Sequence, residues 1–216
     1  MLALLHTSPV HVPVFDALRD LAHPGLELRH HVDAALLERA RSEGPDAVAD
    51  AVTAVLTRVV EEGARAVLCT CSTIGGVAET AVGVGVPVLR VDRPMAAAAV
   101  AVGPRVLVLA ALESTLAPTA ALIEEEARRA GRPVTVRTRL VGGAWSRFEA
   151  GDTEGYLRRV TEAADSVTGA DVIVLAQASM AAAGERASVR VPVLAGPASG
   201  LAAAAAVAAR PGTRAR

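Results

Sequence analysis

The sequence predicts an α/β protein of two similar lobes, each a four-stranded parallel sheet flanked by helices. Short runs rich in valine and leucine alternate with longer stretches of helical period, a pattern typical of parallel strands covered by helices. The segment Val86-Pro-Val-Leu recurs as Val191-Pro-Val-Leu, an offset of 105 residues (191 − 86). A chain of 216 residues is long enough to bury a core in each of two small lobes.

The strands are expected in chain order at eight short runs, four in each half. In the first half these are residues 2–5, 26–30, 66–69 and 86–91. In the second half they are residues 105–110, 134–140, 171–176 and 191–195. Equal numbers of strands in the two halves are what an internal duplication predicts.

Helices are expected between the strands over residues 45–62, 118–130 and 153–167. In the first, Val52 and Leu56 belong to one apolar stripe, which Gly63 closes. In the second, Pro118 suits the first helical turn. A further alanine-rich helix is expected to start at Pro94.

The lobe boundary is expected near that alanine-rich helix, because no linker stands out by composition. We expect a first lobe of residues 1–95 plus 200–216 and a second lobe of residues 96–199. In this interpretation the apolar segment 200–209 crosses back onto the first lobe and the last residues fray.

Composition excludes several classes of protein. A net charge of −1 and only four aromatic residues argue against binding to nucleic acid. The longest apolar tract covers about half of the roughly 20 residues that a membrane-spanning helix needs. The apolar start lacks the basic leader of a signal peptide, so we expect a cytoplasmic protein that does not enter a membrane. The sequence contains no lysine, which rules out catalysis through a lysine Schiff base.

Neither a metal nor a cofactor is expected. Cys69 and Cys71 are two residues apart, too constrained for an ordinary disulfide, and no partner ligands stand at zinc spacing. The glycines that follow Cys71 fit neither a dinucleotide loop nor a phosphate loop.

Short polar side chains gather directly after four of the expected strands. They are His6-Thr7-Ser8, Cys71-Ser72-Thr73, Glu113-Ser114-Thr115 and Gln177-Ala178-Ser179. Because ligands of parallel sheets bind beyond the carboxyl ends of strands, hydroxyls and helix N-termini there predict a site for a small carboxylate. The alternative for each serine or threonine is an ordinary helix cap.

Cys71 is the expected acid, base or nucleophile, since a helix N-terminus favours the thiolate form of a cysteine placed there. The alternative is an inert buried thiol, the role that Cys69 suits. His6, at the end of the first strand, is a candidate second acid or base.

Several motifs together resemble the aspartate/glutamate/hydantoin racemase superfamily over nearly the whole chain. They are Cys71-Ser-Thr-Ile-Gly-Gly, Pro87-Val-Leu-Arg-Val-Asp92 with Pro94-Met95, Leu112-Glu-Ser-Thr115 and Val174-Leu-Ala-Gln-Ala-Ser-Met180. The resemblance implies a cofactor-independent enzyme with its active site in the cleft between two α/β lobes. It also implies two catalytic cysteines, one per lobe, and members that are often dimeric or larger, which leaves a homo-oligomer open.

Carried over by position, the resemblance makes Cys71 the first-lobe catalytic cysteine. The substrate-binding positions it implies are Thr7, Ser8, Ser72, Thr73, Ser114 and Thr115. The second-lobe Cys-Thr-His motif is replaced by Gln177-Ala178-Ser179, and a glutamine amide neither takes nor gives a proton at neutral pH. Gln177 is then expected to hydrogen-bond the carboxylate or a developing enolate.

Three functions remain open from the sequence. The first is a racemase or isomerase that uses the Cys71 thiol as acid and base on a small carboxylic acid such as an amino acid or hydantoin. The second is a decarboxylase, lyase or maleate-type isomerase that needs only one thiol. The third is a two-lobed carboxylate-binding protein without turnover.

Overall fold

The computed structural model describes residues 1–210, and these divide into two compact units. Unit 1 comprises Met1–Val91 and the C-terminal segment that begins at Ala198, and unit 2 comprises Asp92–Pro197. The first boundary lies between residues 91 and 92, a few residues before the expected boundary between residues 95 and 96. The alanine-rich helix packs with the strands of unit 2 from its first turn, which explains the difference. The part of the expected first lobe beyond residue 210 lies outside the described residues.

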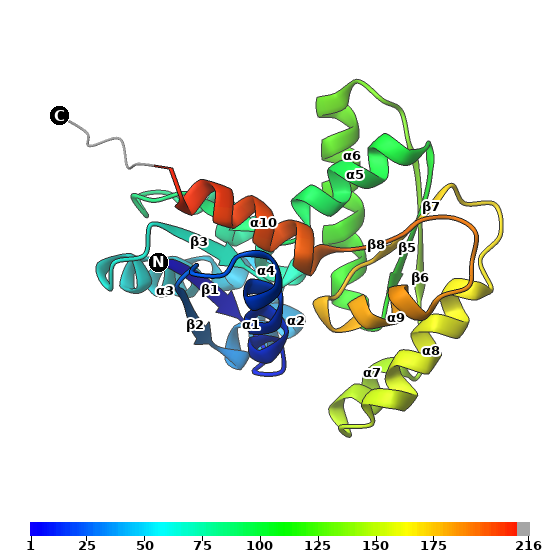
Figure 1. Cartoon of the computed structure of the whole chain (residues 1–216), viewed down its shortest axis with the longest axis horizontal. Coiled ribbons are helices and arrows are strands. Elements are labelled where there is room, and N and C mark those ends of the chain that lie inside the picture. Colours follow the sequence, from blue (N-terminus) through cyan, green and yellow to red (C-terminus); the bar gives the residue numbers. More distant parts are fainter. Residues whose placement is uncertain (211–216) are drawn as a thin grey trace. The chain divides into compact units, whose positions relative to one another are not determined.

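Unit 1 contains a parallel sheet in the order β2-β1-β3-β4 (Figure 1). Its strands are β1 (Leu2–His6), β2 (Leu28–Val32), β3 (Ala66–Cys69) and β4 (Val88–Arg90). Its helices are α1 (His11–Ala22), α2 (Ala34–Glu43), the 3₁₀ turn η1 (Pro45–Val48), α3 (Ala49–Glu61), α4 (Ser72–Thr80) and most of α10 (Gly196–Ala208).

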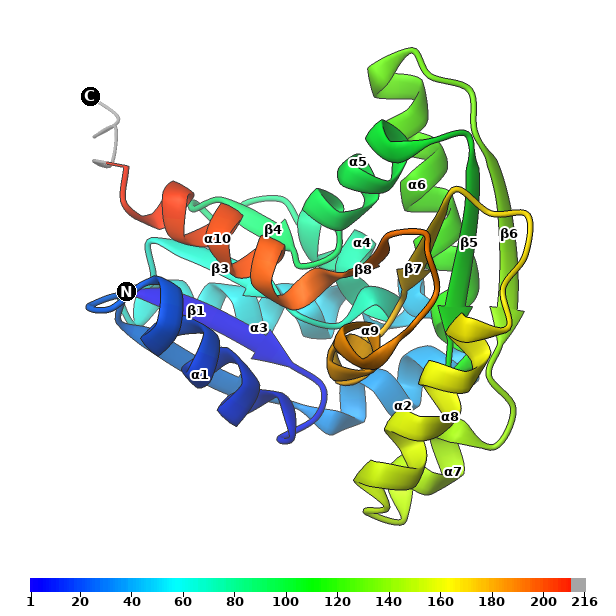
Figure 2. The same ribbon diagram turned by 45° about the vertical axis from the view of Figure 1, so that its right-hand side comes forward.

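Helices cover both faces of the sheet of unit 1 (Figure 2). The core is therefore divided into two layers, because successive side chains of a strand point to opposite faces. On one face, Leu2 and Leu4 of β1 and Leu68 of β3 pack against α1 and α10. On the other face, Leu5 of β1 and Cys69 of β3 pack against α2, α3 and α4. Consecutive residues of β1 and β3 therefore face different helices, which decides where each polar side chain beyond the strand ends points.

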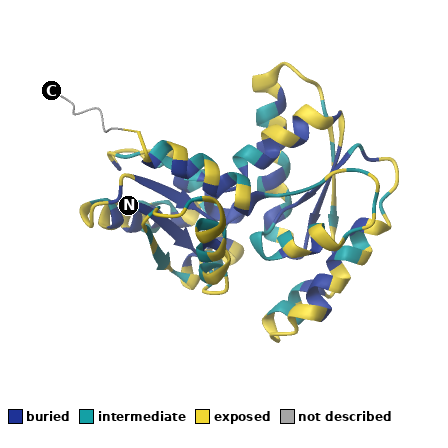
Figure 3. Cartoon of the chain, viewed as in Figure 1, coloured by how far each residue is buried: buried dark blue, intermediate teal, exposed yellow. Residues whose placement is uncertain are grey.

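Unit 2 repeats this topology with a parallel sheet in the order β6-β5-β7-β8. Its strands are β5 (Arg105–Ala110), β6 (Thr135–Leu140), β7 (Val172–Leu175) and β8 (Val193–Ala195). Its helices are α5 (Arg93–Val102), α6 (Leu116–Ala130), α7 (Ala144–Glu149), α8 (Thr153–Asp165) and α9 (Ala181–Arg186), with 3₁₀ turns η2 (Glu113–Thr115) and η3 (Ala178–Met180). Helices α5 and α6 cover one face of the sheet and α7, α8 and α9 the other. In both units the central strands are the most buried part (Figure 3).

The eight expected strands and the two-lobed α/β class are confirmed, with differences at strand ends. β2 begins two residues later than expected, because the Leu26 N–H bonds back to the His23 carbonyl in a turn. β4 and β8 are shorter than expected, because Pro87 and Pro192 supply a carbonyl to the neighbouring strand but have no N–H to donate. Helices α1, α2, α7 and α9 were not predicted from the sequence.

Helix α10 docks closely on the end of β4. A Cβ atom added to Gly200 would lie 2.4 Å from the carbonyl oxygen of Val91, so this contact requires glycine. Leu201 and Ala204 follow on the buried side of the helix, against the sheet. Between residues 1 and 210, no helix combines the length and the hydropathy required to cross a membrane.

Candidate functional site

In unit 1, two of the predicted polar segments follow neighbouring strands. Thr7 and Ser8 come after β1, and Cys71 comes after β3, which lies beside β1 in the sheet. Because the strands are parallel, these segments lie at the same edge of the sheet. Thr7 is buried and Ser8 is partly exposed. Neither residue is the N-cap of α1, which is Val10.

Cys71 is the N-cap residue of α4 and has an extended backbone, with φ −107° and ψ 115°. Its side chain makes no capping hydrogen bond, so the first N–H groups of α4 are not satisfied by the thiol. Cys71 is 8% exposed, whereas Cys69 is fully buried and its Sγ contacts the Cys71 carbonyl at 3.7 Å. Of the two thiols, only Cys71 retains accessible surface.

Ser72 and Thr73 form the first turn of α4 and are both buried. Gly75, in the same helix, lies against Arg90. A Cβ atom added to Gly75 would lie 3.3 Å from Arg90 Nε. Arg90 is 6% exposed, so a buried guanidinium packs on the first half of this helix. Arg90 was expected only as part of a strand, and the paired glycines Gly75 and Gly76, which leave room for its side chain, are the sequence signal for this contact.

His6 is placed differently from what the sequence suggested. Its side chain is fully buried, and both ring nitrogens are engaged: Nδ1 lies 2.8 Å from Thr70 Oγ1 and Nε2 lies 2.8 Å from His30 Nδ1. Burial, with smaller contributions from the neighbouring His11 and His30, lowers the pKa of His6 from 6.5 to about 3. His6 is therefore a neutral ring inside unit 1, with neither nitrogen open to a substrate.

In unit 2, Gln177 follows β7 and its amide is held at both ends. The Ala111 N–H donates to Gln177 Oε1 at 2.9 Å, and Gln177 Nε2 donates to Thr115 Oγ1 at 3.1 Å. Since a backbone N–H can only donate, the Ala111 contact fixes which end of the amide is oxygen. One N–H of the amide takes no part in the hydrogen bonds described for residues 1–210.

The other predicted residues of unit 2 lie on the short turns beyond β5 and β7. Ser114 is partly exposed and Thr115 is buried, at the junction of η2 and α6. Ser179 in η3 is partly exposed, and its Oγ lies 2.8 Å from the phenol oxygen of Tyr156. Ala178 begins η3 and offers only backbone groups. Thr115 is the N-cap of α6 without a side-chain capping bond, so it does not act as an ordinary cap.

Cys71 and Gln177 occupy equivalent positions in the two units. Each stands two residues beyond the end of the strand, Cys69 in β3 and Leu175 in β7 (71 − 69 and 177 − 175), and each is the N-cap of the helical turn that follows. The 106 residues between them (177 − 71), one more than the offset of the Val-Pro-Val-Leu repeat, thus relate structurally equivalent positions. A thiol in one unit is matched by an amide in the other.

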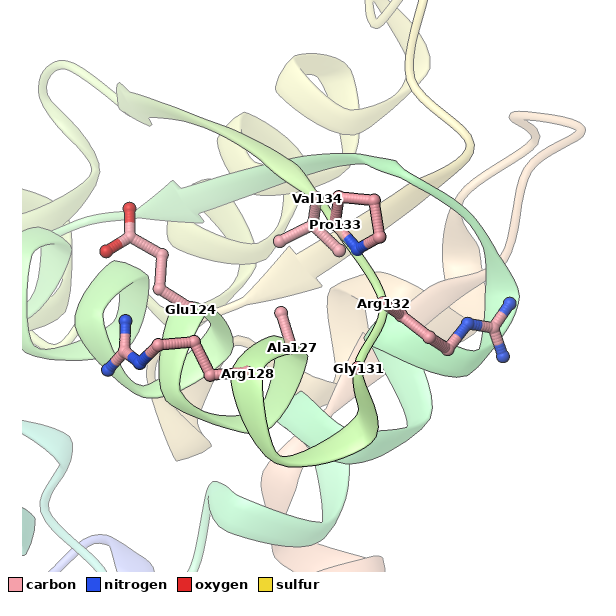
Figure 4. A pocket seen from close by; sticks show the side chains of 7 residues that line it. All are labelled: Glu124, Ala127, Arg128, Gly131, Arg132, Pro133 and Val134. Atoms are coloured by element: carbon pink, nitrogen blue, oxygen red, sulfur yellow. The ribbon is translucent and has the colours of Figure 1, made fainter.

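No group of three or more histidine, cysteine, aspartate or glutamate side chains arranged to hold a metal ion occurs within the described part of the chain. A surface cavity of about 440 Å³ lies between the end of α6 and the segment leading into β6 (Figure 4). It is lined by Arg128, Arg132 and Glu124 among others, at the amino end of β6. The predicted site residues stand at the carboxyl ends of strands, so this cavity is not part of their site.

Comparison of the chain with protein families finds one match, to Asp/Glu/Hydantoin racemase, over residues 11–204. No curated protein shows significant similarity to the sequence.

Solved structures share the fold. The Picrophilus torridus aspartate racemase has a TM-score of 0.69 and 14% sequence identity, covering 96% of this chain and 93% of that one. Allantoin racemase from Pseudomonas fluorescens has a TM-score of 0.61 and 24% identity, covering 95% of this chain and 90% of that one. A mutant of arylmalonate decarboxylase, in its sulfate-associated form, has a TM-score of 0.61 and 19% identity, covering 98% and 96%. At these identities the structural likeness establishes the fold, and the family match over most of the length establishes kinship: the chain belongs to the Asp/Glu/hydantoin racemase family.

Proposed function

We propose that this protein is a cofactor-independent isomerase of the racemase type that acts on a small carboxylic acid, with the Cys71 thiol as its acid and base. The observation that carries the proposal is the placement of Cys71, the more accessible of two thiols, at the start of α4 and beyond the end of a buried parallel strand. Membership of the racemase family supports the same reading.

The neighbours of Cys71 suit a carboxylate. The N-terminal turn of α4 directs backbone N–H groups and the positive end of the helix dipole toward the end where Cys71 stands. We assign Ser72 and Thr73, with Thr7 and Ser8 from the loop after β1, to binding the substrate carboxylate. These are neutral donors, so they bind an anion without placing a formal positive charge beside the Cys71 thiol.

The second unit supplies hydrogen-bond donors in this proposal, all assigned to the same substrate. Gln177 has one amide N–H left after its bonds to Ala111 and Thr115, and a donor in that position stabilises negative charge that develops on a carboxylate or enolate. Ser114, Thr115, Ser179 and the backbone of Ala178 complete this set.

His6 is not assigned the second proton transfer. Both of its ring nitrogens are occupied, and a pKa of about 3 means that the ring is neutral at pH 7, a weak base with no imidazolium proton to give. Only one residue of the proposed site, Cys71, therefore transfers a proton at neutral pH.

A single thiol also favours a second candidate, a decarboxylase or related lyase in which Cys71 protonates one face of a carbanion. A maleate-type isomerase, with the thiol adding to a double bond, has the same requirement. The specific observation behind these candidates is that Gln177, the unit 2 counterpart of Cys71, carries an amide, which neither takes nor gives a proton at neutral pH. A solved structure of similar fold is that of an arylmalonate decarboxylase mutant.

The test is a panel of amino acids, hydantoins, malonates and maleate incubated in heavy water with the wild type and with Cys71→Ala. Deuterium entering unreacted substrate identifies reversible proton transfer, and release of carbon dioxide identifies the lyase. Ligand binding without exchange or turnover across the panel would instead identify a binding protein and overturn the enzymatic proposal.

The same proposal places the protein in the cytoplasm. Both cysteines are free thiols, which suits a reducing compartment. Fractionation with a periplasmic or secreted marker as reference tests this location. We also propose that the protein can form a homo-oligomer, and light scattering tests this by measuring its mass in solution.

A further inference from the structure

A continuous chain of polar side chains crosses the sheet of unit 1 on the face covered by α1 and α10. Thr70 Oγ1 is 2.8 Å from His6 Nδ1, and His6 Nε2 is 2.8 Å from His30 Nδ1. His30 Nε2 is 3.3 Å from Asp16 Oδ1 on α1. The chain thus runs from the residue directly before Cys71 to a carboxylate whose side chain is 39% exposed.

The chain has two self-consistent directions of hydrogen bonding. In the first, the Thr70 hydroxyl donates to His6 Nδ1, and His6 Nε2–H donates to His30 Nδ1. His30 Nε2–H then donates to the Asp16 carboxylate, and both rings are neutral.

In the second direction, the Thr70 hydroxyl donates to the Leu5 carbonyl, 3.1 Å away, and accepts from His6 Nδ1–H. His6 Nε2 then accepts from His30 Nδ1–H, so His30 carries a proton on both nitrogens beside Asp16. This arrangement holds one more proton than the first, and the extra proton is on His30. His6 is neutral in both, in keeping with its pKa of about 3.

The two directions differ in how firmly Thr70 is tied to β1. The Leu5 carbonyl already accepts the Thr70 N–H at 3.0 Å, one residue beyond the last pair of the β1–β3 ladder. In the protonated arrangement the same carbonyl also accepts the hydroxyl. Thr70 is then held twice, immediately before the backbone of Cys71.

Unit 2 provides an internal comparison, because its backbone is bonded in the same way. The Ala176 N–H donates to the Leu109 carbonyl at 2.9 Å, as the Thr70 N–H does to the Leu5 carbonyl, so Ala176 is the counterpart of Thr70.

Ala110 is the counterpart of His6 by the same criterion. The Val141 N–H donates to the Ala110 carbonyl at 2.7 Å, and the Asp33 N–H donates to the His6 carbonyl at 2.9 Å. Ala110 and Ala176 are both buried in the apolar core against α5 and α6. This fold therefore accepts alanine at both positions, and the polar pair occurs in the unit that contains Cys71.

We infer that His30 and Asp16 are positioning residues for the Cys71 site. Through His6 they set whether the Thr70 hydroxyl donates to His6 or to the Leu5 carbonyl, and uptake of one proton by the Thr70–His6–His30–Asp16 series switches the hydroxyl from the first acceptor to the second. The predicted effect of these residues on activity rests on the proposed function of Cys71, but the predicted change in hydrogen-bond direction does not. Neither His30 nor Asp16 touches the thiol; both act through the segment that carries it.

The groups around the chain are few. Helix α1 contributes Asp16, its ion-pair partner Arg19 at 3.2 Å, and His11, whose ring centroid is 6.1 Å from that of His6. Burial lowers the pKa of His11 to about 4, which keeps this ring neutral near pH 7. The residues of α10 that pack on this face are leucine, alanine and valine, and none titrates.

The test has two readouts that do not depend on turnover. Nitrogen NMR of the histidine rings follows which nitrogen of His6 carries the proton between about pH 5 and pH 8, the range in which histidine charge ordinarily changes. The rate of Cys71 alkylation is measured over the same range in a Cys69→Ala background. We expect the His6 proton to move from Nε2 to Nδ1 as the pH falls, with an inflection in the alkylation rate at the same pH, of about 3- to 10-fold for groups coupled in one network.

Asp16→Asn and His30→Asn are expected to abolish that inflection and to lower kcat with KM unchanged. Asp20→Asn and His31→Asn are matched controls, because Asp20 also pairs with Arg19 and His31 lies beside His30 but bonds to Arg58. Both controls are expected to keep the inflection. The double variant His6→Ala with Thr70→Ala copies unit 2, so it is expected to fold and to lose the inflection.

A His6 ring that keeps one protonated nitrogen throughout the range would overturn the inference, as would an inflection that survives in Asp16→Asn and in the double alanine variant. If deuterium exchange into substrate persists in Cys71→Ala while the His6 proton still moves between its two nitrogens, the proposed function is wrong. The reversible hydrogen bonding of Thr70, His6, His30 and Asp16 would still be correct.

Discussion

Tyr156 and Ser179 are joined by a hydrogen bond of 2.8 Å between the phenol oxygen and the serine hydroxyl. Tyr156 comes from α8 and is 1% exposed, packed beside Phe148 at a ring separation of 5.3 Å. A side chain from the core of unit 2 thereby fixes the rotamer of Ser179, a residue we assign to substrate binding. The packing of Tyr156 in the core of unit 2 therefore holds the Ser179 hydroxyl in place.

Tyr156→Phe removes this bond and leaves the packing nearly unchanged. We expect unit 2 to lose about 1 kcal/mol of stability, the usual net value of one hydrogen bond, and KM to rise because Ser179 is no longer held. Denaturant unfolding measures the loss of stability. It is followed by the fluorescence of Trp145, the one tryptophan of the chain, which lies in unit 2. Unchanged stability and an unchanged KM would show that the bond does not hold Ser179.

The same tyrosine predicts a loss of stability at high pH. Burial raises the pKa of Tyr156 from 10.0 to about 12, so the unfolded chain loses the phenol proton at lower pH than the folded one. The free energy of unfolding should therefore fall as the pH rises from 10 toward 12. Tyr156 is the one tyrosine in the sequence, so absorbance of the phenolate reports its titration directly. A midpoint near 10 in the folded protein would contradict this.

Gln177 is expected to serve both fold and binding, and two substitutions separate these roles. Gln177→Leu leaves the Ala111 N–H without its acceptor and should cost about 1–3 kcal/mol of stability in unit 2. Gln177→Glu keeps that acceptor and accepts from the Thr115 hydroxyl, so the fold should be nearly as stable as wild type.

The added carboxylate of Gln177→Glu should nevertheless repel an anionic substrate and raise its Kd at least about tenfold, as like charges placed together disfavour binding by more than 1.4 kcal/mol. Isothermal binding and unfolding measurements on the two variants check both parts. Equal binding by Gln177→Glu and wild type would remove Gln177 from the site.

Gly200→Ala should destabilise unit 1. The new Cβ would fall 2.4 Å from the Val91 carbonyl oxygen, so α10 has to shift off the end of β4, at a cost of about 1–3 kcal/mol for an overpacked contact. Gly142→Ala is the matched control, since a Cβ there meets no atom within 4 Å. Circular dichroism during urea unfolding compares the two. Equal stability would mean that α10 does not pack as described.

Acid should destabilise unit 1 through its buried histidines. The pKa values of His6 and His11 fall from 6.5 to about 3 and about 4 on folding, so the unfolded chain binds more protons below pH 6.5. The free energy of unfolding should therefore be level above about pH 7 and fall at lower pH, by up to about 1.4 kcal/mol per pH unit for each histidine. The His6→Ala and Thr70→Ala double variant should show a shallower slope. An identical slope would contradict the burial of His6.

The sequence predicted the sheets well, because buried parallel strands such as β3 and β7 are short apolar runs that no other element resembles. The repeat of Val-Pro-Val-Leu, at an offset of 105 residues, identified the two halves, and the nearly equal offset of 106 residues relates Cys71 to Gln177. Helix α2 escaped prediction because ten residues with half their positions charged or polar carry little apolar period. The local sequence signal for this helix is Asp33, the N-cap residue that accepts the Ala35 N–H.

The setting of His6 was beyond sequence reasoning. Whether a histidine at a strand end faces solvent or the core depends on strand register and on the helix above it. Here α1, which was not predicted, covers the face on which His6, Thr70 and His30 meet. For the same reason Tyr156 in α8 gave no sign of its bond to Ser179, 23 positions later.

The most direct test of the proposed chemistry compares the two thiols in one assay. Deuterium uptake from heavy water into a turned-over carboxylic acid is measured for wild type, Cys71→Ala and Cys69→Ala. Because a positioned acid or base contributes about 10²- to 10⁴-fold, uptake should fall by at least about 10²-fold in Cys71→Ala. It should stay within severalfold of wild type in Cys69→Ala, whose thiol is fully buried. Uptake that survives in Cys71→Ala would contradict the assignment of Cys71 as the proton-transferring residue.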